Sequence, residues 1–118
     1  MTINAKIEAQ IRNIFEYNLL DDYQLKDERP WGEDGNMDAF AHGKEYGSHY
    51  LAEEGLKLLD KKNAILLKEL LSKNLLDEER LEDDMPWGED SVLYAFDNGK
   101  EFGAHDLAEE ILELLQEN

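Results

Sequence analysis

The chain has 118 residues and carries 29 acidic against 12 basic side chains, which gives a formal net charge of −17. It has no cysteine, which excludes disulfide bonds, thiolate zinc sites and thiol catalysis. Such an acidic domain repels nucleic acid and anionic membranes and attracts basic proteins. Residues 1–8 lack the apolar run of a signal peptide, and no stretch reaches the roughly 18 apolar residues of a membrane span. We expect one cytoplasmic domain over residues 1–118.

The sequence is internally duplicated. Residues 11–59 align without a gap on residues 67–115, and 25 of the 49 aligned positions are identical. The clearest match is the pentapeptide Pro-Trp-Gly-Glu-Asp, which begins at Pro30 and again at Pro86. A duplication of this kind places the same surface on a protein twice.

Each repeat opens with a pattern typical of an amphipathic helix. Isoleucines recur every three or four residues in repeat one (residues 1–60), and leucines do so in repeat two (residues 61–118). The patterns predict helices from about Thr2 to Leu20, with Thr2 as N-cap, and from about Lys61 to Leu76. Because a half of this size buries little apolar surface alone, we expect the two repeats to pack together.

An acidic segment joins each of these helices to the Pro-Trp-Gly-Glu-Asp motif. Only Leu25 and Leu81 are apolar in the middle of the two segments. We expect each segment to form a short helical turn or loop that this leucine pins to the core. Proline disfavours helix at the preceding residue, and a tryptophan in such a loop usually anchors it. Trp31 and Trp87 are therefore predicted at equivalent core positions.

The last part of each repeat combines helical spacing with small residues. Apolar residues and glycines recur every three or four positions from Val92 to Leu114, which predicts one helix from about Ser91 to Gln116. An interior glycine costs a helix roughly 1 kcal/mol relative to alanine, so close packing by another helix must compensate. The small-residue stripe consists of Ala39, Gly43 and Gly47 in repeat one and of Ala95, Gly99 and Gly103 in repeat two.

A β-hairpin is the alternative for this region. Asn98-Gly99 favours a tight turn between two strands, and His42-Gly43 is a weaker version of the same signal. The preferred fold is all-α, with two tandem helical-hairpin repeats packed about a pseudo-twofold axis. The alternative is an α+β fold with a short hairpin around Gly43 and Gly99.

A repeated pattern of two glutamates and a histidine is the strongest candidate for chemistry. Residues four apart share a helix face, so the three side chains of each pattern are neighbours. Di-iron bundles space Glu and His by three residues instead, and an adjacent lysine opposes a bound cation. We interpret the histidines as surface residues held between carboxylates, and we expect no metal and no cofactor. The patterns are Glu45, His49 and Glu53, repeated as Glu101, His105 and Glu109.

Nothing else in the sequence resembles an active site. No nucleophile lies beside a base in both repeats, and no glycine-rich phosphate loop is present. Ser48 precedes His49, but repeat two has Ala104 at the position of that serine. We therefore expect a protein that is not an enzyme.

The acidic residues themselves form the candidate site. They cluster every five or six residues in the segments that lack apolar periodicity. B-DNA carries one negative charge per roughly 1.7 Å of its axis, in two strands, and carboxylates on two equivalent loops could imitate two phosphate rows. The predicted partner-binding residues are Asp21, Asp22, Asp27, Glu28, Glu33, Asp34, Asp77, Glu78, Glu79, Glu82, Asp83, Asp84, Glu89 and Asp90.

In length, acidity and lack of catalytic residues, the whole chain resembles small bacterial DNA-mimic proteins, in particular the monomeric kind that binds the histone-like protein HU. The resemblance involves no shared motif. It implies a protein that occupies the DNA-binding surface of a basic HU-type protein and competes with DNA. We expect a monomer or weak homodimer that does not itself bind nucleic acid.

An immunity or antitoxin-type inhibitor of a basic toxin enzyme, such as a nuclease, is the alternative function. Such inhibitors bind one partner tightly, with buried aromatic anchors in addition to charge. Tyr23, Tyr46, Tyr50 and Tyr94 are the tyrosines available for this role.

Overall fold

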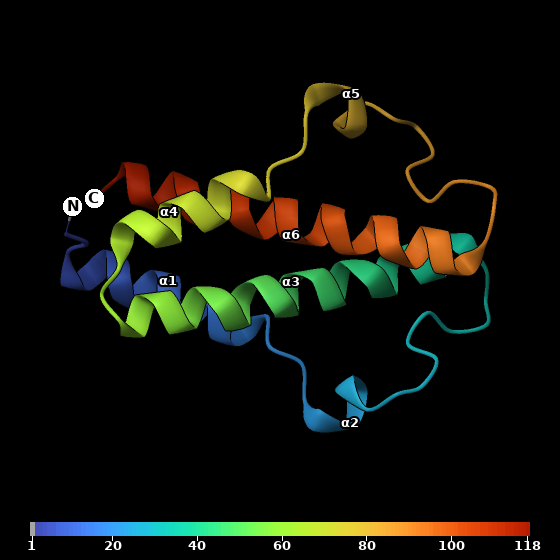
Figure 1. Cartoon of the computed structure of the whole chain (residues 1–118), viewed down its shortest axis with the longest axis horizontal. Helices are drawn as coiled ribbons and strands as arrows, with labels where there is room; N and C mark the ends of the chain where they lie inside the picture. Colours follow the sequence, from blue (N-terminus) through green and yellow to red (C-terminus); the bar gives the residue numbers. More distant parts are fainter. Residues whose placement is uncertain (1) are drawn as a thin grey trace.

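The described part of the chain, residues 2–118 of a computed structural model, is entirely helical apart from its turns and loops (Figure 1). The all-α class is confirmed. The hairpin alternative is wrong, because the third and sixth helices run unbroken through Gly43 and Gly99. The helices are α1 (Ala5–Tyr17), α2 (Asp22–Leu25), α3 (Asn36–Asp60), α4 (Ala64–Lys73), α5 (Glu78–Leu81) and α6 (Val92–Gln116).

The first helix of each repeat is shorter than predicted, by three residues at each end. Asn4, rather than Thr2, is the N-cap of α1, and its side chain accepts a hydrogen bond from the Ile7 N–H at 2.9 Å. Asn63 caps α4 in the same way. At its N-terminal end, the apolar pattern of α1 extends beyond the helix because Ile3 packs against the core although it precedes α1.

The two long helices, α3 and α6, lie side by side and run parallel (Figure 1). A Cβ atom at Gly43 would collide with the backbone oxygen of Phe96, and one at Gly99 with that of Phe40. Only glycine permits this approach, so the predicted close packing of the stripe is confirmed. The next pair of glycines, Gly47 and Gly103, meets the backbone of Lys100 and Lys44 in the same way.

Two apolar clusters lie along this helix pair. The four-helix core is formed by α1, α4 and the C-terminal halves of α3 and α6. The aromatic core lies between the N-terminal halves of α3 and α6. The largest fully buried side chains belong to the four-helix core and are Phe15, Ile11, Leu59, Leu67, Leu71 and Ile111.

The tryptophans of the pentapeptide pack against the aromatic core, as predicted. Each contacts a phenylalanine of the other repeat. Trp31 meets Phe96 edge-on with 6.2 Å between ring centroids, and Trp87 meets Phe40 at the same distance. The repeats therefore exchange aromatic contacts, and each acidic segment is anchored at its end by the opposite repeat.

Equivalent residues also make equivalent hydrogen bonds. The Asn18 side-chain amide donates to the Ile14 carbonyl at 2.8 Å, and Asn74 donates to the Leu70 carbonyl at the same distance. Such paired contacts fit a duplicated unit, while the pseudo-twofold axis stays a prediction.

We predict that Gly103→Ala lowers the free energy of unfolding by about 2 kcal/mol, because the new methyl group overpacks the Lys44 backbone. Urea unfolding followed by circular dichroism measures the change. Ala41→Gly, at an exposed position of α3, serves as a control for helix propensity and should cost about 1 kcal/mol. A Gly103→Ala protein as stable as the parent would contradict the close helix contact.

Candidate protein-interaction surface

All fourteen predicted partner-binding carboxylates are exposed. They lie in two segments, which we call the first acidic loop (residues 21–34, with α2) and the second acidic loop (residues 77–90, with α5). The loops project from opposite edges of the α3–α6 pair (Figure 1). The molecule measures 44 × 35 × 18 Å, and the loops face apart along the 35 Å direction. The fold places α2 and α5 on opposite edges, but the last residues of the two loops converge. Asp34 and Glu89 line one shallow pocket beside the start of α3, and the Asn36 side chain donates to the Gly88 carbonyl at 3.1 Å.

The second acidic loop is the more negative of the two. The first has six carboxylates and two basic side chains, for a net charge of −4. The second has eight carboxylates and one basic side chain, for a net charge of −7. Together they carry eleven of the seventeen net negative charges, although their 28 residues are less than a quarter of the chain. The loops therefore dominate the electrostatic field of the protein.

Four of these carboxylates also shape the loops. Asp21 is the N-cap of α2 and accepts a hydrogen bond from the Gln24 N–H at 2.8 Å, and Asp77 caps α5 through the Arg80 N–H at 2.9 Å. A short polar side chain at an N-cap satisfies a helix donor that otherwise has no partner. Two further aspartates, Asp27 and Asp83, accept from the backbone N–H two residues later.

The leucine predicted to pin each acidic loop does so in only one of them. Leu25 packs against the aromatic core. Leu81 is 41% exposed, so the prediction is wrong for the second loop. There Arg80 connects the loop to α6 instead, through an ion pair with Glu101 at 3.0 Å.

The two repeated histidines are buried, which corrects their predicted surface position. His49 is 3% exposed and its Nδ1 accepts a hydrogen bond from the Leu20 N–H at 2.9 Å. His105 accepts from the Leu76 N–H at 3.0 Å. Helical spacing shows which residues share a helix face, but not what that face packs against. The hydrogen-bond donor of each histidine lies 29 residues away in the chain. Each histidine fixes the backbone at the point where an acidic loop begins.

The glutamates of the repeated pattern do not gather around the histidine. His49 Nε2 lies 3.7 Å from Glu53, while Glu45 pairs with the half-exposed His42. Within residues 2–118 no group of three or more His, Asp or Glu side chains is placed to hold a metal ion.

The tyrosines differ in how available they are to a partner. Tyr23 is 89% exposed, whereas Tyr50 and Tyr94 are half-exposed. Tyr46 is buried and its hydroxyl donates to the Gln24 carbonyl, so it is not a free anchor. Burial, followed by the charge of the nearby Asp27 carboxylate, raises the pKa of Tyr46. A fifth tyrosine, Tyr17 at the end of α1, is also 89% exposed.

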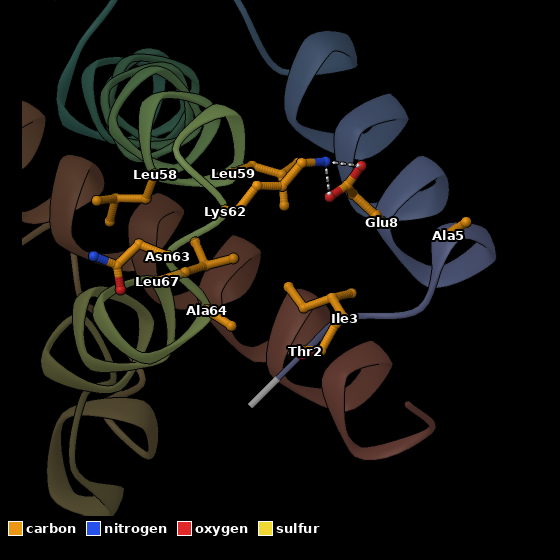
Figure 2. A pocket seen from close by; sticks show the side chains of 10 residues that line it. All are labelled: Thr2, Ile3, Ala5, Glu8, Leu58, Leu59, Lys62, Asn63, Ala64 and Leu67. Atoms are coloured by element: carbon orange, nitrogen blue, oxygen red, sulfur yellow. Dashed lines mark hydrogen bonds and ion pairs between the residues drawn. The ribbon is translucent and has the colours of Figure 1, made fainter.

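A separate cavity of about 350 Å³ lies at the end of the molecule that carries the chain termini (Figures 1 and 2). It is lined by the start of α1, the end of α3 and the start of α4. Lys62 bonds both carboxylate oxygens of Glu8 beside it, at 2.8 and 3.0 Å. Among residues 2–118, this mutually neutralised pair supplies the charged groups that line the cavity, which is remote from both acidic loops.

No helix in residues 2–118 combines the length and the apolar character needed to cross a membrane. Comparison with protein-family models, curated protein sequences and solved structures gives no match. The function is therefore inferred from the surface itself.

We predict that His105→Ala lowers the free energy of unfolding by about 2 kcal/mol, because the Leu76 N–H loses its acceptor in a buried place. His105→Asn should recover part of this loss, since its amide oxygen can replace Nδ1 as the acceptor. His42→Ala, at an exposed histidine, should change stability by at most about 0.5 kcal/mol. Equal losses in His105→Ala and His42→Ala, measured in urea, would disprove this role.

Proposed function

We propose that the protein is an acidic DNA mimic, which occupies the DNA-binding surface of a basic protein and competes with DNA for it. An HU-type nucleoid protein is the partner that we propose first. The observation that carries the proposal is the display of fourteen exposed carboxylates on two loops, held in place by the core.

The way the loops are held supports binding. Flexible acidic tails lose conformational entropy when a partner orders them. Here each loop is fixed at its start by a buried histidine and at its end by a half-buried tryptophan. Carboxylates that are already in place meet a partner's arginines and lysines with less loss of entropy.

We propose that the α2 part of the first loop and the α5 part of the second bind separately. Because α2 and α5 lie on opposite edges of the α3–α6 pair, each can contact a basic surface without the other. The second acidic loop, with a net charge of −7, should contribute more to steering the encounter than the first. Binding should weaken as salt screens the charges.

An inhibitor of a basic toxin enzyme is the second proposal, and the exposed tyrosines favour it. Tyr17 and Tyr23 are both 89% exposed in repeat one. At the equivalent positions repeat two has Lys73 and Glu79. An aromatic ring displayed beside charge is typical of a specific, tightly bound interface.

We predict that the triple variant Glu82→Gln, Asp83→Asn, Asp84→Asn weakens binding to HU by about tenfold or more, because three charges of the second acidic loop are lost. The amide of the new asparagine at 83 keeps the acceptor for the Met85 N–H. The measurement is displacement of fluorescent duplex DNA from HU, followed by anisotropy in low salt.

The matched control removes the same number of charges from the end of α6 and its C-cap, by Glu110→Gln, Glu113→Gln and Glu117→Gln. These residues are exposed and outside both loops. The control should lose less than about threefold in affinity. Equal losses from the two triple variants would mean that binding has no localised surface.

The two proposals differ in how DNA affects the complex. A DNA mimic shares its binding site with DNA, so excess duplex should release partners captured from a bacterial lysate. A toxin inhibitor held by aromatic anchors should retain a single enzyme in excess DNA and in high salt. Mass spectrometry of the captured proteins, with and without duplex DNA, separates the two.

A further inference from the structure

An arginine joins the second acidic loop to α6. The guanidinium of Arg80 pairs with the Glu101 carboxylate at 3.0 Å and lies 5.7 Å from the centre of the Phe102 ring. A carboxylate on one side and an aromatic ring on the other are the two partners that a planar guanidinium favours.

The first acidic loop has an equivalent carboxylate and aromatic ring, but in the described part of the chain no arginine lies between them. Glu45 and Tyr46 stand at the positions of Glu101 and Phe102, but Gln24 stands where repeat two has Arg80. The Gln24 side chain turns back to its own helix, where its oxygen accepts from the Asp21 N–H at 3.4 Å. It therefore does not reach across to α3 as Arg80 reaches across to α6.

A cavity of about 180 Å³ lies at this place in repeat one, between the first acidic loop and α3. Its anionic groups are Asp27 and Glu45. Two aromatic side chains, Tyr23 and Tyr46, also line it. In residues 2–118 the Glu45 carboxylate has one ion-pair partner, the His42 imidazole at 3.7 Å.

We propose that this cavity receives an arginine side chain of the protein partner. The inference rests on the proposed function, since it assigns one contact of the partner that the acidic loops bind. The partner's guanidinium pairs with Glu45 and Asp27 and stacks against a tyrosine, as Arg80 does with its carboxylate and ring in repeat two. The chain thus carries the occupant of the site in one repeat and lacks it in the other.

Two cationic groups line the cavity as well, and their partners determine whether they oppose an arginine. Arg29 pairs with Glu33 at 2.8 Å, so its charge is compensated. His42 is half-exposed and carries a charge only when protonated. Arginine is favoured over lysine because the planar guanidinium pairs with a carboxylate through two parallel N–H groups and can lie flat on a ring at the same time, whereas an ammonium group is a compact, more strongly hydrated point charge.

A pair of peptides tests the inference directly. Acetyl-Gly-Arg-Gly-amide and its lysine twin are titrated into the ¹⁵N-labelled protein in low salt, near neutral pH. The arginine peptide should give saturable shifts in α2 and the first half of α3. The lysine twin, which controls for general attraction to an acidic protein, should bind at least about fivefold more weakly.

Exchanging residues between the repeats provides the decisive variants. Gln24→Arg supplies the missing arginine from within the chain and should abolish peptide binding to the first acidic loop. The fold accepts arginine here, because Arg80 holds the equivalent position in α5. Gln116→Arg adds the same charge at an exposed position, and this variant should bind the arginine peptide as tightly as the parent protein does. Arg80→Gln should open a second site, so that shifts also appear in α5 and α6.

Glu45→Gln should weaken binding of the arginine peptide by about tenfold. Glu101→Gln, in the repeat that already holds Arg80, should leave the affinity of the first acidic loop for this peptide within about twofold of the parent. Equal binding of the two peptides, or an unchanged site in Gln24→Arg, would overturn the inference. Competition with DNA for HU, measured with the same variants, distinguishes failure of the arginine site from failure of the proposed function. If the variants compete with DNA as the parent protein does, the proposed function stands without the arginine site. If the arginine peptide binds but HU does not, HU alone is rejected as the partner.

Discussion

The parallel contact between α3 and α6 is the constraint on which the rest of the molecule depends. Gly43 and Gly99 bring the two backbones so close that any side chain would collide with a carbonyl of the other helix. This contact places the N-termini of both helices at the same end, where each pentapeptide precedes its helix. Each tryptophan can then reach a phenylalanine of the opposite repeat. The α2 and α5 parts of the acidic loops are consequently held on opposite edges, while the ends of the loops meet.

Parallel neighbours also align two helix dipoles, with both positive ends together. The acidic ends of the pentapeptides, Glu33-Asp34 and Glu89-Asp90, precede these helix starts, and negative charge near a helix N-terminus is favourable. The charge of this region therefore has a structural benefit in addition to its proposed role in binding. The same holds for Asp21 and Asp77, which cap the short helices within the loops.

The duplicated scaffold carries two different surfaces. Capping aspartates, buried histidines and anchoring tryptophans are the same in both repeats, because they fix the backbone. The repeats differ at buried positions such as Gly55 and Ile111 and also at exposed ones, where repeat one displays tyrosines and an open cavity. Repeat two has more acids and fills the equivalent place with Arg80. In the proposed function, the second acidic loop steers the encounter and the first makes the more specific contact.

The sequence by itself determined the repeat and the exposure of the fourteen carboxylates, and it favoured the all-α class and one long helix in each repeat over a hairpin. These properties follow from local spacing and charge. It misplaced the ends of α1 and α4; at the start of α1 this is because Ile3 extends the apolar pattern beyond the capping Asn4. Only the tertiary structure decided that His49 and His105 are buried, since their hydrogen-bond donors lie 29 residues away. It also decided that α2 and α5 lie on opposite edges while the ends of the two acidic loops meet, and that Arg80 occupies a place left open in repeat one. These relations depend on how distant segments pack.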